Sequence, residues 1–261
     1  MSIRVLTFSV DRPDLLARCI RSVMAQTRSP PIRHTVLSER WESLQVHPLL
    51  AALVDAVDWV SISSEPFVGN SSVRMARLRQ RALNSVKEEF VAFLDDDNAI
   101  TPDHFARLHA CIEAGADAAY SWRRLELPDG RPFDGSWYPW HPDPDRSATL
   151  HAWCVASGMI VPGSDVVRDG PIDNPHADNV ATVDMNEWLF RTQALRRVGF
   201  ECQFTPDEIA NQVGEDDKLL ARVRATGMRL GCSNSPTVLY RLGGVSNRLP
   251  PRLAANGEVI A

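Results

Sequence analysis

At 261 residues the chain is long enough for one large α/β domain or for one domain with an appended lobe, and its 44% hydrophobic and 23% charged residues are ordinary for a soluble globular protein. The net charge of −5 argues against nucleic acid as the main partner, because binding to a phosphate backbone needs a basic surface. The five cysteines are odd in number and lack a Cys-x-x-Cys pair, which argues against a disulfide framework or a zinc site. There is no signal peptide, and no apolar run approaches the roughly 20 residues that span a bilayer, so we expect a cytoplasmic protein without a membrane span.

Strand and helix patterns alternate through the first hundred residues. Strands are predicted at residues 3–9, 32–38, 59–63 and 90–94. Helices are predicted at 15–24, after a turn at 11–14, at 49–57, and from a turn with a capping serine at 69–72 through 86. Strand–helix units that follow one another imply a parallel, doubly wound sheet whose ligands bind at the carboxyl ends of the strands. The last of these helices carries Arg74, Arg77, Arg79 and Arg81, which we interpret as a solvated face, with one arginine reaching a nucleotide as the alternative.

The strand at 90–94 consists of five apolar residues and ends abruptly in Asp95, Asp96 and Asp97. Thr101-Pro102-Asp103 then has the residue types of a helix start. Carboxylates crowded at a strand end repel one another unless a cation lies among them, and Mg²⁺ and Mn²⁺ prefer oxygen ligands. The pattern therefore favours a metal-assisted ligand site, with a solvated acidic turn as the alternative.

The second half of the chain has weaker patterns. Residues 120–180, rich in Pro, Asp and Trp, predict loops in place of a long helix. After them we expect a strand over 185–191, a short helix over 194–200, a helix from 214 to 227 and closing strands at 228–232 and 238–242. We divide the chain into residues 1–110, 111–247 and a carboxyl-terminal tail at 248–261.

Two groups of side chains in this half are candidate site residues. Glu215 and Asp216 lie at the start of a predicted helix, where the helix dipole favours ionised acids, and helix capping is the alternative role. Trp137, Trp140 and Trp153 could stack on a sugar or simply pack in the core. The histidines at 141, 151 and 176 fit loop residues better than metal ligands.

Several segments, in the right order, resemble the inverting nucleotide-sugar glycosyltransferases of the GT-A fold called family 2. They are Thr7 to Pro13, which is similar to the family's opening strand and turn; Met24 to Thr27; residues 69–81, with Ala76-Arg77 on the family's Ala-Arg pair; Leu94 to Asp97 on its Asp-x-Asp motif; and Glu215 to Leu219 on its Glu-Asp motif. The likeness covers residues 3–110 well and 184–247 more loosely. It implies a single α/β domain with the GT-A fold, Rossmann-like and with helices on both faces of a mostly parallel sheet.

The resemblance also implies an activity and its residues. The donor is a nucleoside-diphosphate sugar, and the acceptor is a hydroxyl of a small molecule or a saccharide. A divalent ion, Mn²⁺ or Mg²⁺, would be held by Asp97 with Asp95 and would neutralise the leaving diphosphate. Asp216, beside Glu215, would be the general base of an inverting attack. The nucleotide candidates are Thr7, Ser9, Asp11, Arg12, Glu39, Arg77, Asp95 and Asp96. A homo-oligomer is left open.

The chain departs from the family in two places. Glu39-Arg40 stands where the family usually has Asp-Asp-Gly-Ser, and Arg241 to Ser246 contains no late histidine. Three other functions compete. A phosphohydrolase of the haloacid dehalogenase type also uses Asp-x-Asp after a strand, but Ala99 departs from its pattern. A sugar-phosphate nucleotidyltransferase requires a Gly-rich loop that is missing after residue 9. A non-catalytic nucleotide- or sugar-binding protein would not need both acidic clusters.

Overall fold

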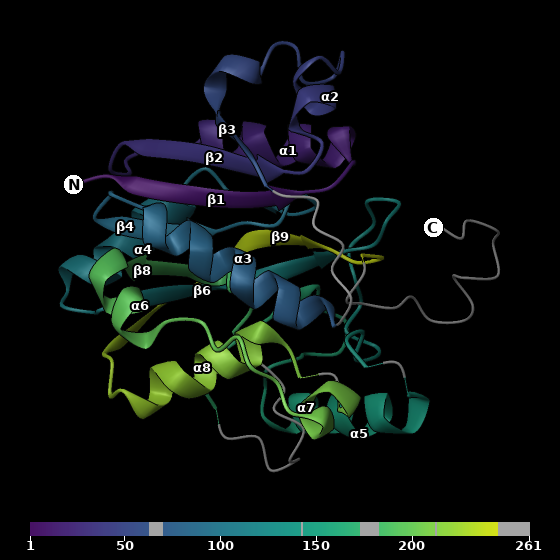
Figure 1. Cartoon of the computed structure of the whole chain (residues 1–261). Coiled ribbons are helices and arrows are strands. Elements are labelled where there is room, and N and C mark those ends of the chain that lie inside the picture. The colour runs from purple at the N-terminus through teal and green to yellow at the C-terminus, as the bar shows by residue number, and fades with distance from the viewer. Residues whose placement is uncertain (63–69, 142, 173–182, 212, 245–261) are drawn as a thin grey trace.

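The computed structural model describes residues 1–62, 70–141, 143–172, 183–211 and 213–244, and its centre is one nine-stranded sheet (Figure 1). The strands lie in the order β3-β2-β1-β4-β8-β6-β9-β5, and β7 pairs with β6 beside this path. Their bounds are β1 Ile3–Ser9, β2 Ile32–Ser38, β3 Asp58–Ser61, β4 Phe90–Phe93, β5 Ala99–Ile100, β6 Ala118–Glu126, β7 Val166–Val167, β8 Trp188–Arg191 and β9 Leu230–Arg241.

The amino-terminal half of the sheet is parallel, as the sequence predicts. β1 pairs in parallel with both β2 and β4, and β2 pairs in parallel with β3. All four residues of β4 are buried, because β4 lies inside the sheet between β1 and β8 and is covered on both faces. The acids that follow β4 therefore emerge at the carboxyl-terminal edge of a rigid, interior strand.

The carboxyl-terminal half mixes strand directions. β8 runs antiparallel to both β4 and β6, β9 is parallel to β6, and β5 is antiparallel to β9. The two closing strands predicted at 228–232 and 238–242 are one twelve-residue strand, β9. Its pairing with β6 shifts register near Trp122, and Asn234 has a φ of 50°, so an irregularity in the strand explains the interrupted pattern.

Helices cover both faces of the sheet. α3, α6 and α8 pack against one another in front of the strands, and α4 packs on β6 and β9 (Figure 1). Their bounds are α1 Pro13–Met24, α2 Trp41–Gln45, α3 Ser71–Ser85, α4 His104–Glu113, α5 Pro144–Ala156, α6 Thr192–Val198, α7 Pro206–Ala210 and α8 Glu215–Ala225, with 3₁₀ turns η1 at Val54–Ala56 and η2 at Met185–Glu187. Among these described helices, none combines the length and the apolarity that a membrane crossing requires.

Several predicted boundaries are wrong for local reasons. The helix expected over 49–57 consists of turns and η1, while α2 precedes it. α3 is capped by Asn70, whose side chain accepts from the Ser72 backbone, and not by a serine. α4 begins at His104, because the Thr101 hydroxyl donates to Asp103 within the preceding turn.

The middle of the chain is more regular than the sequence indicated. Asp143 caps α5, where Pro144 occupies the first turn, so a thirteen-residue helix stands where we expected loops. The predicted strand at 185–191 is η2 followed by β8. Residues 63 and 69, His176 and the predicted tail at 248–261 lie outside the described residues.

Candidate active site

A cavity of about 250 Å³ opens at the carboxyl ends of the parallel strands, where open α/β sheets bind ligands. Its lining includes seven residues predicted from the sequence: Ser9, Arg12, Glu39, Asp95, Asp96, Asp97 and Glu215. These side chains lie at or just after the carboxyl ends of β1, β2 and β4 and at the start of α8, four segments that are separate in the chain. The fold therefore brings the two acidic clusters of the sequence to one cavity.

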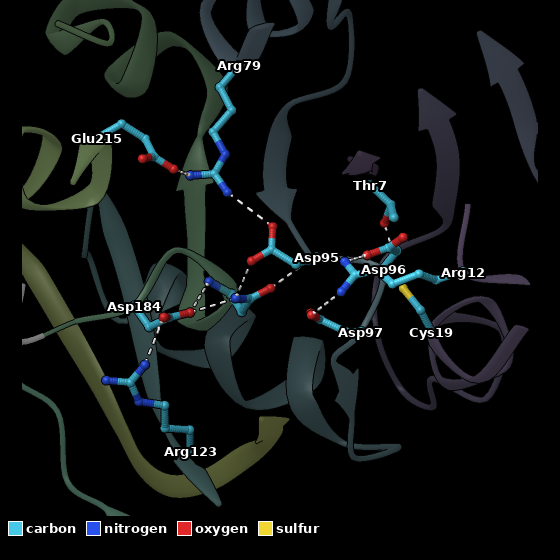
Figure 2. A network of polar contacts seen from close by, with 11 residues as sticks. Thr7, Arg12, Cys19, Arg79, Asp95, Asp96, Asp97, Arg123, Asp184 and Glu215 are labelled. Carbon is cyan, nitrogen blue, oxygen red and sulfur yellow. Dashed lines mark hydrogen bonds and ion pairs between the residues drawn. The ribbon is translucent and has the colours of Figure 1, made fainter. Parts of the chain in front are cut away.

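Asp96 anchors the acid triplet to the amino-terminal turn. Its side chain is 1% exposed, accepts from the Ser9 hydroxyl at 2.7 Å and forms an ion pair with Arg12. Burial raises the pKa of Asp96, and Arg12 opposes this rise. Because both of its oxygens have donors, Asp96 holds the loop after β4 against the turn after β1 (Figure 2).

Asp97 faces the cavity from the same loop. Arg12 donates to its Oδ2 at 2.8 Å, and its side chain is 16% exposed. Burial, together with the neighbouring carboxylate of Asp95, raises the pKa of Asp97 to about 6. A cation bound beside Asp97 would offset this repulsion and would stabilise the ionised form of its carboxylate.

Asp95 is held from two sides. Arg79 donates to its Oδ1 at 3.1 Å, and the Asn186 amide donates to its Oδ2 at 2.9 Å. Arg79, whose side chain is 4% exposed, also forms an ion pair with Glu215 (Figure 2). One buried guanidinium thus joins the tip of β4 to the first residue of α8.

Asp216 follows Glu215 in the first turn of α8 but does not line the cavity. Burial, and then the charge of Glu215, raise the pKa of Asp216 to about 7. Gly214 precedes the pair, and a Cβ at this position would lie 2.3 Å from Asp216 Oδ1. The present position of the Asp216 carboxylate therefore depends on the absence of a side chain at Gly214.

An ion pair between Glu39 and Arg74 lies at the cavity, beside an apolar wall. The wall is formed by Phe8, Val10, Ile62, Met75 and Leu78. An apolar lining together with one donor and one acceptor fits a ring with polar edges. Glu39 thus lines the cavity, paired with an arginine that the sequence does not pair with it, and its role toward a nucleotide stays a prediction.

The structure places three nucleotide candidates outside the cavity lining. Thr7 is fully buried, and its hydroxyl lies 2.9 Å from His34 Nε2. Asp11 accepts from Arg40 at 2.9 Å, and Arg77 is exposed on α3. The site role of these three residues remains a prediction from the resemblance.

The tryptophans of the predicted acceptor platform contribute to packing. Trp137 contacts Phe133 edge to face, and Trp153 packs against the core. Trp140 lies 4.3 Å from the Arg123 guanidinium and donates to the hydroxyl of Tyr240 at 3.3 Å. Tyr240 lines the cavity, so Trp140 contacts a lining residue.

Two residues central to the site were not predicted from the sequence. Arg79 was grouped with the arginines of a solvated helix face, although its spacing from the buried Ala76 and Leu83 places it on the inner face. Asn186 was read as part of a strand, and no motif marks it. Both act on Asp95, which the sequence did single out.

The residues that line the cavity fit a divalent cation that the protein and the phosphates of a substrate would bind together. The described part of the chain contains no group of three or more His, Cys, Asp or Glu side chains arranged to hold a metal. Asp95 and Asp97 place carboxylate oxygens at the cavity, and oxygen is the donor type that Mg²⁺ and Mn²⁺ select. Mg²⁺ usually binds through one or two carboxylates, water and substrate phosphates, so two carboxylates suffice.

Comparisons with known proteins agree with the fold. No family model matches the chain. The O-antigen biosynthesis protein RfbC of Myxococcus xanthus is 25% identical over 240 residues, which are 88% of this chain and 16% of that protein. Solved structures of S. aureus TarS are similar at 14% identity: the 1–349 fragment with UDP-GlcNAc has a TM-score of 0.57 and is matched over 99% of this chain and 62% of that one, and the fragment with UDP has a TM-score of 0.54 over 93% and 61%.

The chain therefore has the GT-A fold that the sequence resemblance predicted, as a single α/β domain. It spans about a sixth of the length of RfbC and about three fifths of the TarS fragments. The fold class is confirmed, and the likenesses to RfbC and TarS agree with the resemblance to GT-A family 2 drawn from the sequence.

Proposed function

We propose that the chain is a metal-dependent glycosyltransferase that moves a sugar from a nucleoside-diphosphate sugar to an acceptor hydroxyl with inversion. One observation carries this proposal: the acid triplet after β4 and the first turn of α8 meet at one cavity and share Arg79. The complexes of TarS with UDP and UDP-GlcNAc support a nucleotide-sugar donor for this fold.

The donor side of the reaction needs charge neutralisation. When bound by Asp97 and Asp95, Mn²⁺ or Mg²⁺ would act as a Lewis acid on the leaving diphosphate. Arg12 holds Asp97 in place and adds a positive charge at the same point of the cavity. The apolar wall and the pair of Glu39 and Arg74 would accept the base of the nucleotide.

The acceptor side needs a base. Glu215 lines the cavity, but its carboxylate is bound by Arg79, whereas Asp216 accepts from the Asp217 backbone at 3.0 Å. A pKa of about 7 keeps much of Asp216 ionised at neutral pH and makes it basic enough to take a proton from a hydroxyl. We assign Asp216 as the general base, with Glu215 positioning the first turn of α8. Attack from the side opposite the leaving diphosphate would invert the anomeric carbon.

A phosphohydrolase with Asp95 as nucleophile is less well supported. Arg79 and Asn186 each donate to one oxygen of Asp95, and these hydrogen bonds stabilise the negative charge of the carboxylate and so lower its nucleophilicity. Trapping of an aspartyl-phosphate analogue with beryllium fluoride would support that alternative.

The proposal is tested by thermal unfolding of the purified protein with Mn²⁺ and each nucleoside diphosphate in turn. A ligand that binds only the folded state raises the melting temperature, by an amount that grows with its concentration over its Kd. We expect at least one diphosphate to stabilise the protein with Mn²⁺ and to lose its effect after chelation by EDTA. If no diphosphate or nucleotide sugar raises the melting temperature, and none is hydrolysed or transferred, the proposed function is wrong.

A further inference from the structure

Asn186 lies between two carboxylates, one at the site and one behind it. Its side chain is on η2, immediately before β8, and the residue is 2% exposed. Its Nδ2 donates to Asp95 Oδ2 at 2.9 Å and to Asp184 Oδ1 at 2.6 Å, while its Oδ1 accepts from the Asp95 backbone at 2.6 Å. All the donors of its amide, and one lone pair of its oxygen, therefore have partners.

These contacts fix the orientation of the amide. Rotating it by half a turn would put Nδ2 against the N–H of Asp95 and Oδ1 against two carboxylate oxygens, so three attractive contacts would become repulsive. Asn186 therefore bridges Asp95 and Asp184 as a neutral donor, without adding a charge between them. A third acid here would repel both neighbours, and an apolar residue would remove one side-chain hydrogen bond from each of them.

Asp184, which accepts from Asn186, is itself held by a residue of the sheet. Arg123 of β6 donates to Asp184 Oδ2 at 2.8 Å (Figure 2). Arg123 also forms an ion pair with Asp169 at 3.0 Å. The guanidinium of Arg123 also lies 4.3 Å from the ring of Trp140 and 5.0 Å from that of Tyr240. Asp184 is thus held by a buried side chain on a rigid strand, and it holds Asn186 in turn.

We propose that Asn186 is a positioning residue that sets the direction of the Asp95 carboxylate toward the cation and the diphosphate. The inference rests on the proposed function, because it assigns Asn186 to the same donor site. Asn186 does not line the cavity and acts only through Asp95. Partners that orient a metal-binding carboxylate typically change metal affinity or activity by about 10- to 100-fold when they are removed.

The test uses calorimetry with Mn²⁺ and the nucleoside diphosphate that most stabilises the wild-type chain. We expect Asn186→Ala to weaken binding of that pair at least tenfold and to raise the KM for the donor sugar while the KM for the acceptor stays unchanged. Asn84→Ala is the matched control, because Asn84 is exposed and lies outside the site. The described hydrogen bond of its side chain is accepted from Gln80. It should bind like the wild type.

Asn186→Asp is the second variant, for the case in which Asn186→Ala does not fold. It keeps the volume of the side chain. The added negative charge alone would attract Mn²⁺ and tighten binding, whereas a displaced Asp95 weakens it, so weaker binding supports a positioning role. Wild-type or tighter binding in Asn186→Asp, or binding within twofold of wild type in Asn186→Ala, would overturn the inference. A wild-type chain that binds no diphosphate overturns the proposed function first, and this inference with it.

Discussion

The guanidinium of Arg79 forms an ion pair with Glu215, 136 residues further along the chain, and donates to Asp95 from its other nitrogen at 3.1 Å. The residue is 3% exposed, so burial removes water from the charge, and these two acids supply the compensation. Arg79 therefore fixes the distance between the donor end of the cavity and the helix that carries Asp216.

Arg79→Lys should break the connection between Asp95 and Glu215. Lysine keeps the charge, but a single ammonium group cannot reproduce the fork that reaches two carboxylates. We expect kcat/KM to fall at least tenfold, and Arg79→Ala to lower the free energy of unfolding by about 3–5 kcal/mol, because it leaves buried charges unpaired. Steady-state kinetics and urea unfolding measure these effects.

Arg81→Lys is the control for Arg79→Lys, since Arg81 is exposed two residues away on the same helix. Its free energy of unfolding should stay within about 0.5 kcal/mol of wild type, as is usual for surface substitutions. If Arg79→Lys had the same kcat/KM as Arg81→Lys and wild type, the solvated-face interpretation of Arg79 would be right and the bridge would have no role.

Asp97→Asn and Asp216→Asn should affect different steps. The first removes the charge of a cavity-lining carboxylate, so metal-assisted binding of the nucleoside diphosphate should be lost. The second removes the base and leaves the cavity lining intact, so donor binding should persist while turnover falls by about 10²- to 10⁴-fold. Calorimetry and single-turnover assays on both variants would expose the reverse pattern.

Turnover should depend on pH through Asp216. Its pKa is about 7, so below pH 7 the carboxyl group is increasingly protonated and cannot accept the proton of the acceptor hydroxyl. We expect kcat to rise with pH through this value and then to level off. A pH profile of kcat at saturating donor and metal checks this, and the same rise in Asp216→Asn would rule out Asp216 as its source.

The same shift predicts a change in stability. Because the pKa of Asp216 is raised from 3.8, the folded chain keeps a proton between about pH 4 and pH 7 that the unfolded chain has released. The free energy of unfolding should therefore decrease as pH rises through this window, and less so in Asp216→Asn. Urea unfolding of both proteins at pH 5 and pH 8 measures the difference.

The sequence was sufficient where local patterns decide structure. β1, α1, β2 and β4 lie where short, largely apolar segments and helical spacing predict them, and the acids after β4 follow from the end of the apolar run of that strand. β6 is not predicted, because it carries Arg123 in its interior, and β9 is predicted as two strands, because its pattern is interrupted at Asn234. Their stability comes from pairing between segments more than a hundred residues apart.

The residues of the candidate site also fall into some that the sequence predicts and some that it does not. Acids at strand and helix ends could be found because the residue type and the local position together mark them. The partners of those acids could not, because an arginine or an asparagine becomes important only through what the fold places beside it. Arg79 is the partial exception, since its spacing from Ala76 and Leu83 already put it on the buried face of α3.

Gly214→Ala should impair catalysis with little loss of stability. The φ of Gly214 is −81°, which alanine adopts without strain, but the added Cβ would lie 2.3 Å from Asp216 Oδ1. The atom that must move is the end of a side chain, so the fold can yield at small cost while the candidate base is displaced. We expect kcat to fall at least tenfold, donor binding to be unchanged and the free energy of unfolding to change by less than about 1 kcal/mol.

Gly170→Ala is the matched control, because its Cβ would meet only the Tyr120 hydroxyl at 3.7 Å, an ordinary contact. Equal kcat values for wild type and Gly214→Ala would mean that the carboxylate of Asp216 does not need its present position, and Asp216 would then not be the base.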